Sequence, residues 1–410
     1  MNPDATTKKI GSIELEKVFS VHQADPVAFT DTIIQEAIKY GASDILIEPR
    51  RDSLVVRARI DGVLYELGTT TIANYPQIVS RIKIMSQLDP TERRRIQEGQ
   101  ATMAFQGRQV NLRVEIALTI YGELIVIRIH EKQTIVMDLS QLGFNQSAFQ
   151  TYQNMLSQKS GLILSSGPTG SGKTTTLYST LAQLNRNKDH NVMTIEDPVE
   201  FQLDGVNQMQ VDQANGFTFA KGLSTILRLS PDIVFVGEIR DQETAKIAIE
   251  SGLTGQLVLS TAHAEDSVRT LFRLMDLNVE TYFLNSALVG VVAQRLVRRI
   301  CPSCKQPLDQ THKDIEVFTN FMGRAPKQLF TSAGCAECNN IGYKGRVGIF
   351  EVLFINSDIR DLLRAKANEA KLRETLLKSG FTTLLRDGFE KAESGFTTVE
   401  EVLRNGLRTS

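Results

Sequence analysis

The apolar positions near the start of the chain predict a small α+β domain. From residue 30 to 40 apolar residues recur at helical spacing, and Gly41 stands where the helix is expected to stop. The next segments are short, rich in β-branched residues and separated by turn residues, as is typical of strands. We expect strands over 44–47, 53–60, 109–115 and 124–129, and a second helix over 75–85.

After Leu142 the pattern changes to apolar strands that alternate with helices. This alternation is typical of an α/β core, in which a mainly parallel sheet is covered on both faces. We therefore expect an α/β fold class with the smaller α+β domain ahead of the core. The strands of the core are expected over 162–165, 192–195, 232–236 and 256–260, and charged amphipathic helices are expected toward the end of the chain.

The length and hydropathy of the chain indicate how many domains to expect and in which compartment the protein works. With 410 residues it is too long for one ordinary core. No apolar run approaches the roughly 20 residues that span a bilayer, and no signal-peptide core is present, so we expect a cytoplasmic chain. The expected parts are an arm or linker over 1–25, the α+β domain over 26–135, the α/β core over 136–300, a cysteine module over 301–345 and a helical region over 346–410.

The most specific motif is a phosphate-binding loop. Residues 167–174 match G-x-x-x-x-G-K-[ST], with a predicted strand before them and a predicted helix over 174–184 after them. The glycines let backbone amides turn inward, and the start of the helix adds its positive dipole end. Lys173 is expected to reach the β- and γ-phosphates of ATP, and Thr174 to ligate Mg²⁺. The expected nucleotide-binding residues are Gly167, Pro168, Thr169, Gly170, Ser171, Gly172, Lys173, Thr174 and Thr175.

Side chains at three strand ends are candidates for the hydrolytic step. Glu238 ends an apolar strand as in a Walker B segment, but Gly237 takes the place of the usual aspartate, so Glu238 itself would serve the metal-bound water. Glu196 ends a second strand and could orient or activate the attacking water. His263 follows a third strand and could sense the γ-phosphate. The alternative is that both acids are ordinary charges at exposed strand ends, and that His263 makes only structural hydrogen bonds.

The four cysteines form two C-x-x-C pairs that predict a structural zinc site. Cys301 and Cys304 are separated by 30 residues from Cys335 and Cys338. Two such turns supply four thiolates for tetrahedral Zn²⁺, and four protein ligands leave no open position for a substrate. The alternative, two disulfides or unpaired buried thiols, is disfavoured in a reducing compartment.

In this order the motifs resemble those of the secretion ATPases of type II systems and of the assembly (extension) ATPases of type IV pili. The resemblance covers nearly everything from about Pro26 onward. We expect no long amino-terminal docking domain of that family here, because 25 residues are too few to form one, and either the sequence is truncated or this member docks differently. The matching segments are GASDI at 41–45, RIDG at 59–62, the loop at 167–174, TIEDPVE at 194–200, GEIRD at 237–241, His263, AQRLV at 293–297, the four cysteines and GYKG at 342–345.

The resemblance implies a RecA-like P-loop ATPase core, a PAS-like amino-terminal domain, and a homo-hexamer with nucleotide sites between the two domains. It implies that Arg113 and Arg128 reach the phosphates, whereas the sequence alone would leave them as solvated strand residues. It further implies a motor for pilin or pseudopilin assembly, peripheral at the inner membrane and attached through a platform protein. Retraction ATPases of this family lack the four cysteines, which favours assembly or secretion.

Two other functions could use the same core. One is a nucleic-acid translocase of DNA uptake or conjugation, but 46 basic and 47 acidic residues give a net charge of −1, and no basic run is interleaved with aromatic residues. We therefore expect no nucleic-acid partner. The other is a non-hydrolysing nucleotide sensor on a zinc scaffold, and the joint presence of Lys173, Glu196 and Glu238 argues against it.

Overall fold

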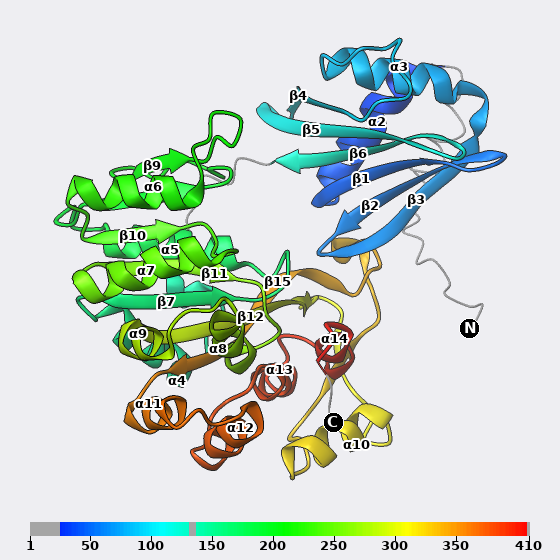
Figure 1. The fold of residues 1–410 in the computed structure, drawn as a ribbon. Coiled ribbons are helices and arrows are strands. Elements are labelled where there is room, and N and C mark those ends of the chain that lie inside the picture. Colours follow the sequence, from blue (N-terminus) through cyan, green and yellow to red (C-terminus); the bar gives the residue numbers. More distant parts are fainter. Residues whose placement is uncertain (1–24, 131–136, 408–410) are drawn as a thin grey trace. The chain divides into compact units, whose positions relative to one another are not determined.

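The computed structural model describes residues 25–130 and 137–407, so nearly all of the expected arm over 1–25 lies outside the described residues. By their contacts the residues divide into two compact units (Figure 1). Beyond residue 300 the chain leaves unit 2 for unit 1 twice and returns each time. Unit 1 comprises Met1–Gln133, Cys301–Lys305 and Ser332–Gly345, and unit 2 comprises Thr134–Ile300, Gln306–Thr331 and Arg346–Ser410.

Unit 1 is built on a six-stranded antiparallel sheet. Its strand order is β3-β2-β1-β6-β5-β4, and the helices α2 and α3 pack on it and on each other. The elements are α2 (Pro26–Lys39), β1 (Ala42–Pro49), β2 (Ser53–Ile60), β3 (Val63–Thr71), α3 (Tyr75–Met85), β4 (Gln97–Phe105), β5 (Arg108–Thr119) and β6 (Gly122–His130).

Alternating apolar residues build the core of unit 1. In β2 every second side chain is buried, as expected for a sheet with one face covered. Helix α2 contributes Ile33 and Ile34 to the same core. Its start is fixed by Asp25, whose carboxylate accepts from two backbone N–H groups, and by Pro26 in the first turn.

Unit 2 contains a seven-stranded sheet in the order β15-β12-β7-β11-β10-β8-β9. The strands from β12 to β9 are parallel to their neighbours, so their carboxyl ends meet at one edge of the sheet. The strands are β7 (Gly161–Ser166), β8 (Val192–Glu196), β9 (Asn207–Gln210), β10 (Ile233–Val236), β11 (Leu257–Ala262), β12 (Leu288–Ile300) and β15 (Tyr343–Phe354).

Helices cover both faces of this sheet. Leu162 and Leu164 of β7 pack with helices α6 to α9, whereas Ile163 packs with α4 and α5 on the other face. The sheet is therefore buried on both sides and holds the strand ends rigidly. The helices are α4 (Gln146–Leu156), α5 (Lys173–Leu184), α6 (Phe219–Ile226), α7 (Gln242–Thr254), α8 (Ser267–Asp276) and α9 (Thr281–Ala287).

The last part of the chain adds short helices to unit 2. Leu363 of α11 and Leu376 of α12 extend the core beside α9, while α10, α13 and α14 pack around the end of β12. The remaining elements are β13 (Lys305–Pro307), α10 (Lys313–Met322), β14 (Phe330–Ser332), α11 (Ser357–Arg364), α12 (Glu369–Lys378), α13 (Leu384–Glu393), α14 (Val399–Arg404) and the 3₁₀ turns η2 (Ile72–Asn74), η3 (Leu139–Gln141), η4 (Leu227–Leu229) and η5 (Ala336–Cys338).

The predicted α/β fold class is confirmed, and every predicted strand and helix of the two folded parts falls on an observed element. The strands β3, β4, β9, β12, β13, β14 and β15 were not predicted from the sequence. Among the described residues, no helix combines the length and the apolar character that crossing a bilayer requires.

Candidate active site

The predicted phosphate-binding loop connects β7 to α5 in unit 2. Strand β7 is buried along its whole length, so the point where the loop begins is held firmly. Gly167, Gly170 and Gly172 have φ angles of 154°, 76° and 89°, in the region that favours glycine. Gly172 is the N-cap of α5, and because it has no side chain, the first N–H groups of the helix remain available to an anion.

The ammonium group of Lys173 lies inside this loop. Its Nζ donates to the carbonyl oxygens of Gly167 at 2.7 Å and Pro168 at 3.1 Å. Burial lowers the pKa of Lys173 to about 8, an effect that Glu238 opposes and Arg295 reinforces. A buried cation of this kind is stabilised by an anionic ligand, which would raise its pKa again.

A cavity of about 450 Å³ adjoins the loop, and all of its lining residues belong to unit 2. Thr174 and Thr175 are exposed at its wall, where a hydroxyl can reach a metal ion. The ends of β8, β10 and β11 form the opposite side. Outside the loop the lining consists of Glu196, Asp197, Pro198, Glu200, Phe219, Phe235, Gly237, Glu238, Thr261, His263, Leu296 and Arg346.

Glu238 and His263 are neighbours in this cavity. They follow the paired parallel strands β10 and β11, and His263 Nε2 lies 3.7 Å from Glu238 Oε2. Glu238 also forms an ion pair with Arg240. Burial and then the charge of Lys173 lower the pKa of His263, although Glu238 opposes them. The pair thus offers a carboxylate that can hold water and an imidazole that favours its neutral form.

Glu196 also lines the cavity, but its carboxylate is held by three side chains. Oε1 accepts from Thr194 Oγ1 at 2.5 Å and from Gln208 Nε2 at 3.1 Å, and Oε2 accepts from the hydroxyl of Tyr178. Burial and the bond to Glu196 raise the pKa of Tyr178 well above its usual value. Because Tyr178 belongs to α5, it ties the helix of the phosphate loop to the end of β8. The sequence analysis missed Tyr178, although its place one turn beyond Thr174 on α5 is a usable signal.

Arg113 and Arg128 lie opposite each other in unit 1. They are register partners in β5 and β6, so their side chains share one face of the sheet. Arg113 pairs with Glu98 and, at 3.7 Å, with Glu115, and Arg128 Nε lies 3.3 Å from Asp44. The structure thus brings the two predicted arginines together, whereas the other candidate catalytic residues lie in unit 2.

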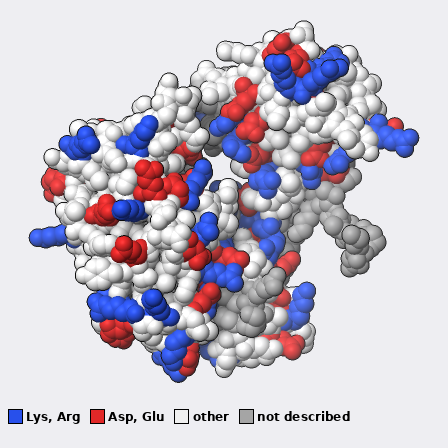
Figure 2. Space-filling model, viewed as in Figure 1, with Lys and Arg blue, Asp and Glu red and all other residues white. Residues whose placement is uncertain are grey.

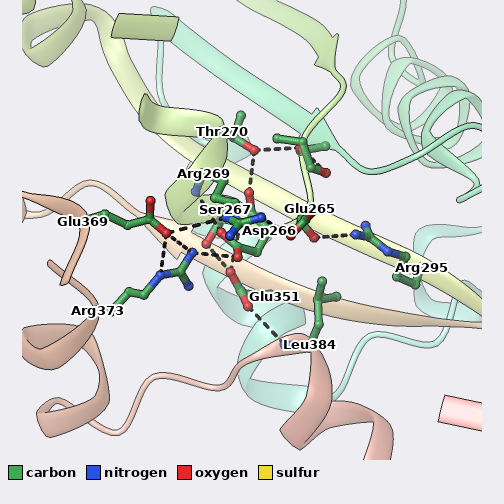
Figure 3. Close-up of polar contacts among 12 residues, drawn as sticks. Glu265, Asp266, Ser267, Arg269, Thr270, Arg295, Glu351, Glu369, Arg373 and Leu384 are labelled. Carbon is green, nitrogen blue, oxygen red and sulfur yellow. Dashed lines mark hydrogen bonds and ion pairs between the residues drawn. The ribbon is translucent and has the colours of Figure 1, made fainter. Parts of the chain in front are cut away.

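A buried polar network anchors the first turn of α8 (Figure 3). Glu351 of β15 accepts from the N–H of Ser267 at 2.9 Å, from the hydroxyl of Ser267, and from the N–H of Leu384 at 3.1 Å. Burial raises the pKa of Glu351. Thr270 Oγ1 lies 2.7 Å from the hydroxyl of Ser166, the last residue of β7. The cavity histidine therefore lies shortly before a helix whose first turn is tied to β7, β15 and α13.

The four predicted metal ligands form one cluster in unit 1. Their sulfur atoms all lie within 4.8 Å of one another. The Sγ atoms of Cys301 and Cys335 are 3.8 Å apart, as are those of Cys304 and Cys338, and Cys335 lies 3.7 Å from Cys338. A tetrahedral Zn²⁺ with bonds of about 2.3 Å requires sulfur separations of about 3.8 Å, so the cluster fits this ion.

Backbone donors prepare one of these thiols for a metal. The N–H groups of Cys335 and Gly342 each lie 3.2 Å from Cys338 Sγ. Burial raises the pKa of Cys338, but these donors and the side chains of Cys335 and Cys304 together lower it to about 7. At Cys304 burial dominates and raises the pKa to about 12. A dication would supply the charge that stabilises all four thiolates.

The loop residues also fit a magnesium nucleotide. Ser171 Oγ is buried and has no hydrogen-bond partner among the described residues. Thr174 follows Lys173 at the start of α5 with its side chain exposed to the cavity. When bound, Mg²⁺ neutralises charge on the phosphates and would be held by Thr174.

Such a loop, with carboxylates at neighbouring ends of a parallel sheet, defines a P-loop nucleoside triphosphatase. Residues 22–404 match the family model of the type II/IV secretion system proteins, so the chain belongs to that family. Its relatives include secretion and pilus ATPases that align with nearly the whole chain, and the chain is accordingly an ATPase.

Two curated relatives and two solved structures illustrate the similarity. The type II secretion system ATPase E of Vibrio cholerae is 40% identical over 385 residues, covering 94% of this chain and 76% of the relative. The type IV pilus assembly ATPase PilB of Myxococcus xanthus is 39% identical over 396 residues, covering 95% and 69%. The Legionella pneumophila ATPase DotB shares the fold, with a TM-score of 0.67 at 20% identity and coverage of 92% and 96%. The pilus retraction motor PilT has a TM-score of 0.60 at 25% identity, with the same coverage.

Proposed function

We propose that this chain is a motor that hydrolyses ATP as a homo-hexamer to drive pilin or pseudopilin assembly in type II secretion or type IV pilus extension. The observation that carries the proposal is a cavity of unit 2 that brings the phosphate loop together with Glu238 and His263. Relatives that are 40% and 39% identical are named for type II secretion and type IV pilus assembly, which supports these two machines.

In this proposal each cavity residue has a separate task. Lys173 binds the β- and γ-phosphates and Thr174 holds Mg²⁺. A water oxygen attacks the γ-phosphorus while the bond to the β-phosphate oxygen breaks, and Glu238 orients this water and accepts its proton. Glu196, fixed at the end of β8, orients the same water from the other side. His263 contacts the γ-phosphate and reports its loss.

Unit 1 supplies the remaining positive charge. Arg113 and Arg128, from the same chain or from a neighbour in the ring, stabilise the charge that develops on the transferred phosphoryl group. Their present partners, among them Asp44 and Glu98, are carboxylates that phosphate oxygens would replace. The cysteine cluster holds a structural Zn²⁺ and takes no part in the chemistry.

The motor works in the cytoplasm, peripheral at the inner membrane, and attaches through a platform protein of the secretion or pilus machine. The same ATPase core could instead move nucleic acid. On the face shown in Figure 2, acidic and basic side chains are interspersed, which does not favour a phosphate backbone as partner.

Phosphate release by the purified chain tests the proposal. It is measured alone, with the cytoplasmic domain of a platform protein, and with double-stranded DNA, while native mass spectrometry reports the assembly in the presence of ATP. We expect a hexamer whose turnover rises with the platform domain and not with DNA. Stimulation by DNA alone would favour a translocase, and an assembled hexamer that binds ATP without releasing phosphate would favour a nucleotide sensor.

A further inference from the structure

The unpredicted strand β12 runs directly beside the phosphate loop. It pairs in parallel with β7, and Ala293 is the register partner of Ser166, the last residue of β7. The next residue of β12, Gln294, is therefore level with the start of the loop. Its side chain is almost completely buried, at 1% exposure. A buried primary amide is costly unless its donors and acceptor are used, so its partners indicate its role.

Both ends of the Gln294 amide are hydrogen bonded to the loop or its strand. Nε2 donates to the carbonyl oxygen of Ser171 at 2.8 Å, and Oε1 accepts from Ser165 Oγ at 3.2 Å. A carbonyl can only accept, which fixes the orientation of the amide: the NH₂ group must face Ser171. The amide thus spans from β7 to the far side of the loop.

Two loop glycines make room for this contact. A Cβ on Gly172 would lie 3.1 Å from Gln294 Nε2, and a Cβ on Gly167 would lie 2.5 Å from the carbonyl oxygen of Gln294. At these positions glycine therefore provides close packing against β12 as well as the positive φ that the loop needs. A side chain at Gly167 would force the loop away from β12, and one at Gly172 would press on the amide of Gln294.

The geometry points to Gln294 as a positioning residue for the phosphate loop, and this is our proposal. In a trans peptide the C=O of one residue and the N–H of the next point in opposite directions. Because Gln294 holds the Ser171 carbonyl on the β12 side, the N–H of Gly172 is directed away from β12, toward the phosphates. Gln294 thereby aligns a donor that contacts the nucleotide, without touching the nucleotide itself.

The next residue keeps Gln294 in place. Arg295 donates from Nη1 to the carbonyl oxygen of Gln294 at 3.1 Å. Its Nη2 donates to the carbonyl oxygen of Glu265 at 2.6 Å (Figure 3). Glu265 lies in the segment between β11 and α8. Arg295 therefore joins the backbone behind the phosphate loop to the segment that follows His263, so that the two sides of the cavity keep a fixed spacing.

The inference rests on the proposed nucleotide site, and ADP binding by calorimetry tests it. In Gln294→Met the Ser171 carbonyl loses its donor while the side chain keeps its length. We expect the Kd for ADP to rise roughly tenfold or more, because an unpaired buried carbonyl lets the peptide rotate. Among hydrolysis parameters, KM for ATP should rise more than kcat falls.

A second variant supplies a pH signature that a purely structural role would not give. In Gln294→Glu an ionised carboxylate faces the Ser171 carbonyl and repels it, whereas the protonated acid can donate to it. Burial favours protonation, so ADP affinity relative to that of the wild type at the same pH should recover between about pH 7.5 and about pH 5.5. The Met variant should show no such recovery.

Asn285→Ala is the matched control. Asn285 is 4% exposed and its Nδ2 donates to the carbonyl oxygen of Arg360 at 3.2 Å, at the end of α9 and outside the cavity. It should lower the melting temperature without weakening ADP binding. A folded Gln294→Met variant that binds ADP as the wild type does would overturn the inference. If the wild type and Lys173→Ala bind ADP equally, the proposed site itself fails.

Discussion

Burial of Lys173 has a measurable consequence for nucleotide binding. The pKa of Lys173 is lowered to about 8 in the free protein, and bound phosphates would raise it again. Below about pH 8 the free site already carries its proton, and affinity should be nearly constant. Above that pH binding must take up a proton, so affinity for ADP should fall by up to about tenfold per pH unit.

Calorimetry in two buffers of different ionisation enthalpy measures this effect, because proton uptake changes the apparent heat of binding. We expect uptake of nearly one proton at about pH 9 and almost none at about pH 7. An affinity that stays constant up to about pH 9.5, with no proton uptake, would contradict the perturbed lysine.

Lys173 and Glu238 should separate binding from chemistry. Lys173→Ala removes a buried charge from the phosphates, which costs about 2–5 kcal/mol of binding free energy. Glu238→Gln keeps the shape of the cavity but removes the proton acceptor, so kcat should fall by about 10²–10⁴-fold while ADP affinity changes little.

Phosphate release and ADP binding, measured on the same preparations, check both variants. Glu243→Gln is the matched control, since Glu243 is an exposed acid in the first turn of α7 and should leave both quantities unchanged. Near-normal turnover by either Lys173→Ala or Glu238→Gln would refute the site assignment.

The site residues that could be predicted are those whose role can be recognised from neighbouring positions in the sequence. The phosphate loop is a contiguous motif, and Glu238 and His263 follow apolar runs whose ends must meet in a parallel sheet. Gln294 was not predictable, because its partner Ser165 is 129 positions away and only the pairing of β12 with β7 brings them together. Such contacts depend on strand order, which hydrophobic periodicity does not encode.

At the scale of elements, the missed strands β4 and β12 escaped prediction for two different physical reasons. Strand β4 lies at the sheet edge and buries only Ala101, so its sequence shows almost no apolar alternation. Strand β12 is the opposite case, since nearly every residue is buried and polar Gln294, Arg295 and Arg298 lie among its apolar ones. A buried run of this kind shows no period of two and resembles a helix in sequence.

The paired strands β5 and β6 carry a prediction of their own. If Arg113 and Arg128 stabilise the transition state, replacing either by alanine should lower kcat by roughly 10³-fold or more, with a much smaller effect on ADP affinity. The measurement is single-turnover hydrolysis in hexamers verified by native mass spectrometry.

Arg50→Ala is the matched control for these arginines. Arg50 lies in unit 1 and is about as exposed as Arg128, with 53% against 52% of the side chain accessible, and it pairs with Glu48 at 2.7 Å. Its loss should leave hydrolysis unchanged. An unchanged rate in assembled Arg113→Ala and Arg128→Ala hexamers would return both arginines to the role of solvated strand residues.

At the scale of the whole molecule, the cysteines lie on the two segments by which the chain re-enters unit 1. Cys301–Lys305 and Ser332–Gly345 belong to that unit, while the residues before, between and after them belong to unit 2. Ile341 packs on the core of unit 1, and the N–H of Gly345 donates to Asp61 at 2.8 Å. The spacing of the cysteines predicted a metal site, but it could not predict these long-range contacts.

A zinc ion at the four thiols would hold both segments together, which gives the final prediction. The purified protein should contain one Zn²⁺ per chain. Cys338→Ser removes the thiol with the lowered pKa, so zinc content and melting temperature should both fall, because metal binding contributes to the free energy of folding. The phosphate loop lies in unit 2, so ADP affinity of the folded fraction should stay within about twofold of the wild type. Ser303→Ala is the control, since Ser303 lies between the ligands Cys301 and Cys304 and its hydroxyl donates to Glu337 at 2.9 Å. Elemental analysis, thiol titration and thermal unfolding decide the outcome. Folded protein without zinc and with four freely titratable thiols would exclude a structural metal. A serine variant that keeps its zinc and its stability would exclude Cys338 as a ligand.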